Sequence, residues 1–128
     1  MSGADSDLRE ILGWLAEYGA SVDEQRWSDL RRVWTPDAEL CVFGQTHRGP
    51  AAIEAFMQRA TRGKHITAVP RVDFAGDRAR SVADFVFFRR EDLAPFTAGV
   101  YRDDWLRRDG RWWLAKREIE VQMRAATT

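Results

Sequence analysis

The spacing of the apolar residues changes from a helical to a strand-like period near Lys64, and this change limits the folds that the chain can adopt. Over residues 8–22, apolar side chains recur at steps of three or four, as on the buried face of an amphipathic helix. A short second helix is predicted over residues 27–34, and it ends there because Pro36 disfavours a helical conformation in the residue before it. A third helix is predicted over residues 50–63, since proline is favoured in a first helical turn.

After Lys64 the sequence has the character of β-strands joined by short turns. Arg108-Asp109-Gly110 is a hairpin signal between two such strands. Pro70 indicates a bulge or an edge position in the first of them. The predicted strands of this half are residues 65–74, 80–89, 97–107 and 111–121. In the first half, residues 38–43 are predicted to form a strand and residues 44–49 a loop.

This order of elements predicts an α+β fold. Strands joined by short turns form an antiparallel sheet, and the helices must bury their apolar faces against it. We therefore expect three N-terminal helices packed on a curved, mostly antiparallel β-sheet. The 128 residues suit one domain. Residues 1–6 are expected to be a flexible N-terminal tail, with Asp5 or Ser6 capping the first helix.

Composition excludes several classes of protein. Twenty basic and 20 acidic residues give a formal net charge of zero, which argues against nucleic-acid binding and against electrostatic binding to a membrane surface. No uninterrupted apolar run is longer than that of residues 85–88, which is too short to cross a bilayer. The polar N-terminus does not resemble a secretory signal, and the single Cys41 fits a reducing compartment, so we expect a cytoplasmic protein.

Five short segments between about Leu8 and Val121 occur in an order that is typical of one family. They are YGASVDEQRWSDL at 18–30, WTPDA at 34–38, RGPAAI at 48–53, HIT at 65–67 and DGRW at 109–112. Together they resemble the SnoaL-like branch of the NTF2-like superfamily. The resemblance implies a cone-shaped fold but no single function, because the superfamily includes polyketide cyclases, scytalone dehydratase, bile-acid dehydratase, ketosteroid isomerase, epoxide hydrolases, dioxygenase small subunits and binding proteins without catalytic activity.

Three residues are candidates for chemistry. Asp23 interrupts an apolar surface, where a carboxylate must be paired or lose its charge; alternatively, it caps the helix that begins near Trp27. His65 opens a predicted strand, and imidazole can exchange protons near neutral pH; a lone histidine at such a position is more often structural or exposed. Tyr18 either lines the same cavity as Asp23, where its hydroxyl could contact a ligand, or is a core aromatic residue with a satisfied hydroxyl.

The resemblance assigns roles to these residues. In scytalone dehydratase-like and bile-acid dehydratase-like members, a tyrosine or aspartate of the first helix acts with a histidine at the start of the second strand, and Tyr18, Asp23 and His65 fall on those positions. The resemblance thus implies that His65 is the base and acid, that Asp23 holds its imidazole, and that Tyr18 donates a hydrogen bond to a developing oxyanion.

Other family positions are not matched. The base of ketosteroid isomerase falls near Val42, and the second histidine of scytalone dehydratase falls near Arg89. The polar pair on the later strand of scytalone dehydratase falls near Val100 and Arg102, and the late arginine of the bile-acid enzyme falls near Val121. The Asp-Arg-Asp set of limonene epoxide hydrolases is not recognisable. The resemblance therefore implies a minimal Tyr-Asp-His site, which leaves the reaction open.

Large apolar residues are candidates for the lining of a substrate cavity, although filling the core is the default role for most of them. The predicted substrate-binding residues are Trp14, Trp34, Phe43, Phe56, Met57, Phe85, Phe87, Arg102 and Trp112, with Phe96 as a further candidate. Arg102 is included as a possible ligand for a substrate carboxylate or phenolate. His47 lies in a turn-rich segment and is expected at the surface. Neither the histidines nor Cys41 form a metal-binding pattern, so we expect no metal and no cofactor.

Trp112 and Trp113 are adjacent in a predicted strand, so one of them must point away from the cavity. An aromatic side chain on the outer face suggests an interface, and the family resemblance also implies a homodimer through the outer face of the sheet.

These observations favour a cofactor-independent enzyme that acts on a hydrophobic cyclic or polyketide-like molecule by proton transfer, which would make it a dehydratase, isomerase or cyclase. The alternatives are a small-molecule-binding module without catalysis and a structural subunit of an oxygenase-type complex.

Overall fold

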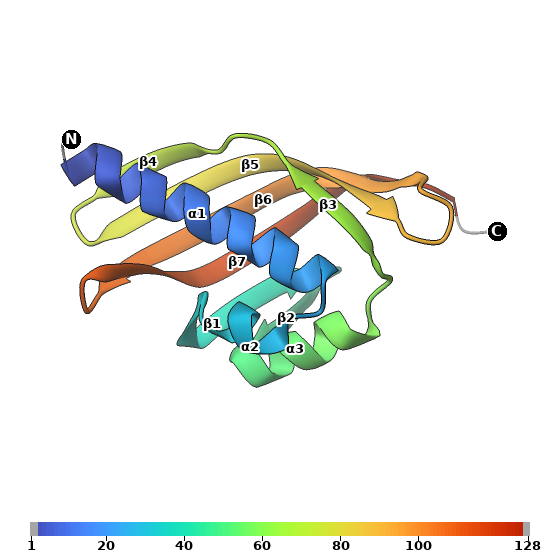
Figure 1. Cartoon of the computed structure of the whole chain (residues 1–128), viewed down its shortest axis with the longest axis horizontal. Helices are drawn as coiled ribbons and strands as arrows, with labels where there is room; N and C mark the ends of the chain where they lie inside the picture. Colours follow the sequence, from blue (N-terminus) through green and yellow to red (C-terminus); the bar gives the residue numbers. More distant parts are fainter. Residues whose placement is uncertain (1–2, 127–128) are drawn as a thin grey trace.

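The protein has an α+β architecture in which helices pack on a curved, mostly antiparallel sheet (Figure 1). The structure is a computed structural model and describes residues 3–126. In chain order the elements are α1 (Gly3–Asp23), α2 (Trp27–Arg31), β1 (Trp34–Val42), β2 (Gln45–Arg48), α3 (Pro50–Arg59), β3 (Gly63–Thr67), β4 (Arg71–Ala75), β5 (Arg78–Arg89), β6 (Pro95–Arg108) and β7 (Arg111–Arg124).

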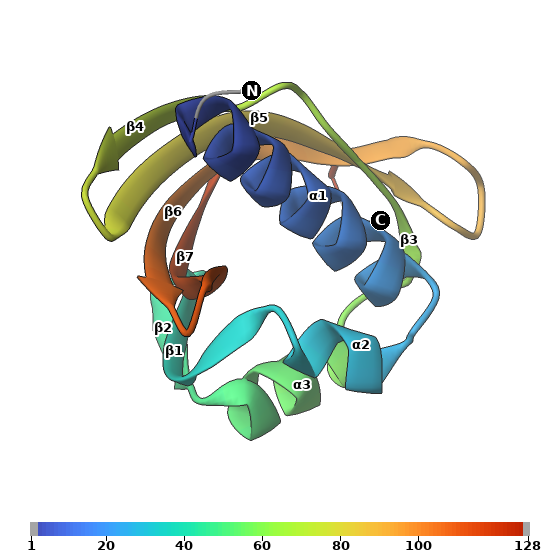
Figure 2. The same cartoon turned by 60° about the vertical axis from the view of Figure 1, so that its left-hand side comes forward.

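The sheet brings the two ends of the sequence together. Its strand order is β2-β1-β7-β6-β5-β3, and β4 pairs with the other half of β5. Strands β1 and β7 run parallel, with Leu40 opposite Arg117, and every other pairing is antiparallel. Figure 2 shows the sheet curling around α1, with α2 and α3 at the opposite side of the opening. The concave face of the sheet therefore faces the helices.

The first helix begins earlier than its apolar pattern indicates. Residues 1 and 2 of the predicted tail lie outside the described residues, and residues 3–6 form the first turn of α1. The proposed caps, Asp5 and Ser6, are therefore inside the helix. No residue in this turn breaks a helix as proline would, and the carboxylate of Asp5 interacts favourably with the positive end of the helix dipole.

The predicted loop at 44–49 is wrong for residues 45–48, because they form β2 and pair with β1. Val42 pairs with Gln45, which leaves a two-residue turn at Phe43 and Gly44. Both turn residues have positive φ angles, 53° and 71°, as in the type I′ turns that join tight hairpins. Strand β2 was missed because its residues, Gln45–Arg48, are polar and carry no apolar alternation.

The predicted strand at 65–74 is two strands, β3 and β4, separated by residues 68–70. Both pair with β5, β3 along residues 85–89 and β4 along residues 78–82. Pro70 has no backbone N–H to contribute to a ladder, and it lies in the break rather than in a bulge.

The core fills only one end of the space under the sheet. Trp105, Trp112 and Leu114 are almost completely buried beneath the first half of α1. Trp112 donates from its indole N–H to Asp7, near the beginning of that helix, at 3.0 Å. Towards the end of α1 the buried side chains form a second, aromatic cluster of Phe85, Phe87, Phe96 and Tyr101, and here the interior opens.

The outer face of the sheet carries paired charges. Arg80 Nε lies 3.6 Å from Asp104 Oδ1. Arg102 Nη2 lies 3.7 Å from Glu120 Oε2. As expected from strand alternation, Trp112 faces the helix while Trp113 is only partly buried. Trp113 lies at the β6–β7 hairpin, where the Arg111 guanidinium stacks on it at 3.5 Å. Within the described residues, no helix combines the length and the apolar character needed to cross a bilayer.

Candidate active site

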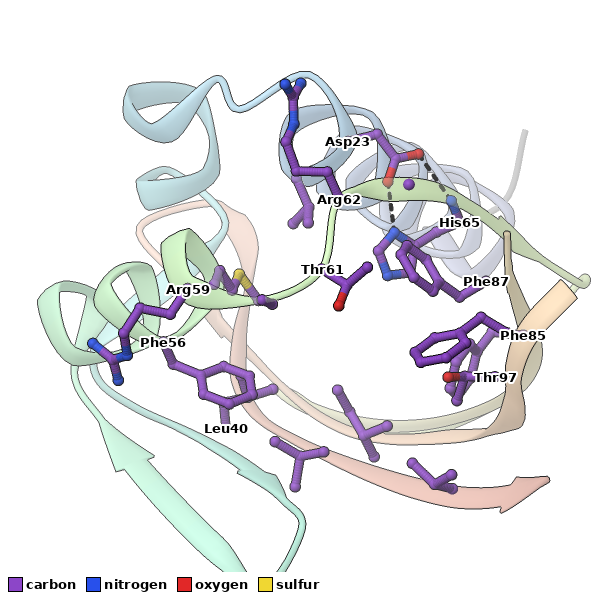
Figure 3. A pocket seen from close by; sticks show the side chains of 18 of the residues that line it. Asp23, Leu40, Phe56, Arg59, Thr61, Arg62, His65, Phe85, Phe87 and Thr97 are labelled. Carbon is purple, nitrogen blue, oxygen red and sulfur yellow. Dashed lines mark hydrogen bonds and ion pairs between the residues drawn. The ribbon is translucent and has the colours of Figure 1, made fainter. Parts of the chain in front are cut away.

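A cavity of about 470 Å³ opens between the end of α1, the end of α3 and the concave face of the sheet (Figure 3). Its wall is mainly apolar, with polar side chains interspersed. The side chains used below are Tyr18 and Asp23 from α1, Phe43 from the β1–β2 turn, Phe56, Met57 and Arg59 from α3, Arg62 and His65 around the start of β3, Phe85 and Phe87 from β5, Phe96 from β6 and Arg124 from β7. Such a site suits an apolar molecule that is oriented by a small number of polar contacts.

Asp23 and His65 meet at this cavity although 42 residues separate them. The Asp23 carboxylate lies with Oδ1 2.6 Å from His65 Nδ1, and its Oδ2 accepts the backbone N–H of the same histidine at 3.0 Å (Figure 3). Asp23 is the last residue of α1 and His65 is in β3, so one carboxylate ties a helix end to the start of a strand. The expected pairing of these two residues is present.

The pairing leaves one imidazole nitrogen available. A carboxylate only accepts hydrogen bonds, so Nδ1 donates its hydrogen to Asp23. The other nitrogen, Nε2, lies on the side of the ring away from Asp23 and faces the cavity (Figure 3). The Asp23 side chain is 6% exposed and that of His65 is 21% exposed. The aspartate is therefore held within the wall, while the histidine can reach a bound molecule.

The ring of His65 is fixed by its neighbours. Its centroid lies 4.7 Å from that of Phe87, the residue opposite it in β5. Two residues earlier, Gly63 lies so close to β5 that an added Cβ would be 2.0 Å from the carbonyl oxygen of Phe88. Only glycine fits there, and this close approach sets the position from which β3 leads to His65.

Tyr18 lies five residues before Asp23 on α1 and is buried in the cavity wall. Its ring makes edge contacts with Trp34 at 5.7 Å and with Tyr101 at 6.4 Å. Burial raises the pKa of the Tyr18 phenol above its ordinary value of 10.0, and the nearby Arg117 guanidinium opposes part of this rise. The phenol is therefore protonated near neutral pH and can act as a hydrogen-bond donor.

A buried ion pair packs against the ring of Tyr18. Arg117 on β7 donates twice to Asp103 on β6, both bonds at 2.8 Å, and both side chains are 1% exposed. The guanidinium carbon of Arg117 lies 4.0 Å from the ring centre of Tyr18 and 3.8 Å from that of Tyr101. Burial alone would lower the pKa of Arg117, but the charge and hydrogen bonds of Asp103 reverse the direction and raise it. A permanent positive charge therefore lies directly behind the phenol.

This ion pair was not predicted from sequence. Asp103 and Arg117 occupy inward positions of strands that otherwise bury apolar groups, and inward polar residues at such positions are the signal that could have revealed them. Ser81 extends the network, because it accepts the indole N–H of Trp105 at 2.9 Å and lies 3.5 Å from Asp103.

The predicted lining residues divide into two groups. Those that line the cavity are Phe43, Phe56, Met57, Phe85 and Phe87, together with the further candidate Phe96. Four predicted residues do not line it: Trp14, Trp34, Arg102 and Trp112. Trp34 and Trp112 belong to the filled end of the core. Trp14 is covered by the Arg111 guanidinium at 4.0 Å, and Arg102 lies half exposed on the outer face of the sheet beside Glu120.

His47 has a more definite environment than the predicted surface position. It is partly buried in β2 and stacks on Phe56 with 4.3 Å between the ring centres. Across residues 3–126, no three or more of the histidine, cysteine, aspartate and glutamate side chains come together as metal ligands would.

Solved structures share the fold of this chain. An NTF2-like protein with a cystatin-like fold from Novosphingobium aromaticivorans is 25% identical, with a TM-score of 0.85 over 94% of this chain and 85% of that chain. A type 2 hexachlorocyclohexane dehydrochlorinase, LinA, is 21% identical, with a TM-score of 0.81 over 94% and 88% of the two chains. A proposed scytalone dehydratase from Novosphingobium aromaticivorans is 20% identical, with a TM-score of 0.78 over 96% and 89%.

No curated protein matches the sequence. The SnoaL-like domain family, in contrast, matches residues 6–118, which include most of α1, every residue of the Tyr18-Asp23-His65 group and most of the sheet. Because this match covers most of the sequence, the chain is a member of the SnoaL-like family.

Proposed function

We propose that the protein is a cofactor-independent enzyme that catalyses proton transfer on a hydrophobic cyclic or polyketide-like small molecule. The reaction class is an elimination such as dehydration, or a related isomerisation or cyclisation. The observation that carries the proposal is the Asp23–His65 pair in the wall of an apolar cavity, with Nδ1 bound to the carboxylate at 2.6 Å and Nε2 free to reach a ligand.

The geometry supports a division of roles. His65 Nε2 accepts a proton from a carbon next to a carbonyl group, and the electron pair of that C–H bond moves into an enolate. Asp23 stabilises the imidazolium that forms and holds its orientation. Tyr18 donates a hydrogen bond to the enolate oxygen, and the charge of Arg117 behind its ring strengthens that donation.

The second half of the reaction uses the same proton. In a dehydration, the enolate electrons form the new C=C bond, the C–O bond of the leaving hydroxyl breaks, and the proton on Nε2 goes to that oxygen, so that water leaves. In an isomerisation, the proton returns to a different carbon. Two of the similar structures are described as a dehydrochlorinase and a proposed scytalone dehydratase, and both names describe eliminations.

Deuterium exchange tests the proposal without knowledge of the natural substrate. Carbonyl-containing polycyclic compounds are incubated with the protein in D₂O, and mass spectrometry measures deuterium uptake and loss of water. Wild-type protein should accelerate uptake by at least one compound of the panel. His65→Ala should lower that rate by about 10²–10⁴-fold, while the matched change at the other histidine, His47→Ala, should leave it within a few-fold of wild type.

An equal rate in His65→Ala and wild type would overturn the assignment of His65. Saturable binding across the panel without exchange or product would identify the protein as a binding module instead. Co-purification of a larger oxygenase-like partner, again without exchange, would favour the structural subunit.

A further inference from the structure

Three exposed arginines lie at the edge of the cavity, where it opens to solvent. Arg59 ends α3, Arg62 lies in the connection to β3, and Arg124 ends β7, and all three are exposed residues of the cavity wall. Figure 3 shows the guanidinium groups of Arg59 and Arg62 at the periphery of the lining side chains, outside the apolar interior. We call this set the basic rim.

The basic rim lacks acidic partners. Across residues 3–126, no carboxylate lies within ion-pair distance of Arg59, Arg62 or Arg124. Arg124 instead has its guanidinium carbon 5.0 Å from the ring centres of Phe43 and Phe96, two cavity residues. The contact keeps this positive charge over the aromatic wall of the mouth.

The unpaired charged side chains that line the cavity are therefore all positive. Asp23 is the one carboxylate among the lining residues, and it is already bound to His65. Three cations remain in a chain whose total formal charge is zero. Arginines at other places show the contrast, since Arg31 pairs with Glu54 at 2.8 Å and Arg48 pairs with Glu39 at 2.7 Å.

We propose that the ligand of this cavity carries an anionic group that the basic rim binds, while its apolar body lies against Phe85 and Phe87. The chemical class is an aromatic or alicyclic molecule with a carboxylate, sulfonate or phosphate at one end. This inference rests on the proposed function in that the anionic end at the mouth would direct the opposite, reacting end towards His65. The sequence predicts Arg102 as a ligand for a substrate anion, but Arg102 faces away from the cavity. The basic rim takes this role instead.

Two fluorescent probes with the same aromatic skeleton test the inference. 1-Anilinonaphthalene-8-sulfonate has an anionic group, and N-phenyl-1-naphthylamine lacks it. The variants are Arg59→Gln, Arg62→Gln, Arg124→Gln and the triple variant, with Arg71→Gln on the exposed strand β4 as the matched control. Each single substitution should weaken sulfonate binding about two- to fivefold and the triple substitution about tenfold or more, whereas naphthylamine binding should change less than twofold.

Two further measurements identify the preferred anionic group and test whether binding is electrostatic. Displacement of the sulfonate probe by 2-naphthoate and by 2-naphthyl phosphate compares carboxylate with phosphate recognition. Added salt should weaken sulfonate binding by wild type and have much less effect in the triple variant, because rim charges are exposed to screening. Melting temperatures verify that every variant is folded.

The inference is overturned if the sulfonate probe shows no saturable binding, if the triple variant binds it as tightly as wild type, or if both probes weaken equally. The outcome is separable from that of the proposed function. His65→Ala should lower the rate of proton exchange by about 10²–10⁴-fold and still prefer the sulfonate probe over the naphthylamine to the same degree as wild type. Loss of the rim should change this preference and leave the Asp23–His65 pair intact.

Discussion

Replacing Asp23 by asparagine preserves the shape of the side chain but changes which of its atoms can donate a hydrogen bond. In the wild type one carboxylate oxygen accepts the backbone N–H of His65 and the other accepts from the Nδ1 of the same residue. An amide has one accepting oxygen and one donating NH₂ group. The backbone N–H can only donate, so it takes the amide oxygen and leaves the NH₂ group facing the ring.

The tautomer of His65 must then reverse. To accept from the amide NH₂, Nδ1 has to lose its hydrogen, and in a neutral imidazole the hydrogen moves to Nε2. The nitrogen that faces the cavity becomes a donor and cannot take a proton from a ligand. Fixing a catalytic histidine in the wrong tautomer slows turnover by about 10⁴-fold in a comparable aspartate–histidine arrangement. We expect about 10³–10⁴-fold here, equivalent to about 4–5.5 kcal/mol of barrier.

The variant should remain folded, because it keeps the backbone hydrogen bond and loses one charge-assisted bond of about 1.5–3 kcal/mol. The chain has only two histidines, so ¹⁵N NMR of the imidazoles can be assigned by comparison with His47→Gln. Wild type should show His65 with its hydrogen on Nδ1, and Asp23→Asn should show it on Nε2. If the hydrogen stays on Nδ1 in Asp23→Asn, or if proton exchange continues at the wild-type rate, the reasoning about the pair is wrong.

Other outcomes concern the buried groups and the outer face. Tyr18→Phe should lower the exchange rate about 10²–10³-fold, as expected for loss of an oxyanion donor, with little change in melting temperature; an unchanged rate would remove the phenol from the reaction. Arg117→Met leaves Asp103 buried without its partner and should lower the free energy of unfolding by about 3–5 kcal/mol in urea melts, part of which Asp103→Leu in the same chain should restore; a loss below about 1 kcal/mol would contradict the pairing. Burial raises the pKa values of both Tyr18 and Tyr101 above 10.0, so the folded state retains phenolic protons that the unfolded state releases. Stability should consequently be unaffected by these groups below pH 10 and fall above it by up to about 1.4 kcal/mol per pH unit for each tyrosine, with phenolate absorbance appearing together with unfolding and not before it. Sedimentation equilibrium should give twice the mass of the chain if the predicted homodimer through the outer sheet face forms, and the mass of one chain would refute it.

The fold was largely predictable because most elements bury a regular face. The helical period over residues 8–22 and the alternation in the later strands both follow from one buried side per element. Strand β2 was not predictable in this way because its side chains are mostly exposed and its turn, Phe43-Gly44, has none of the residue pairs that usually mark a type I′ hairpin. Its pairing depends on the neighbouring strand and not on its own pattern.

The site was predictable only in part. Residue chemistry singled out Asp23 and His65, and the family resemblance implied their pairing. Their contact across 42 residues depends on how α1 and β3 are placed by the whole fold. Strand alternation correctly placed one of Trp112 and Trp113 inside, yet it could not say that Trp112 fills the closed end and does not line the cavity. No local sequence pattern predicts the basic rim, because an exposed arginine looks the same in the sequence whether or not a cavity opens beside it.

The parallel pairing of β1 with β7 bears on when the cavity can exist during biosynthesis. Two neighbouring strands of the cavity wall come from distant parts of the sequence, β1 from the first third of the chain and β7 from the end of the sheet sequence, with Leu40 opposite Arg117. Contacts between residues so distant in sequence carry a large loop-closure entropy and tend to form late. During synthesis on the ribosome, the helices and β1 would keep apolar surface exposed until β7 emerged. The cavity should therefore form last, and a premature stop codon that removes β7 should prevent it from forming.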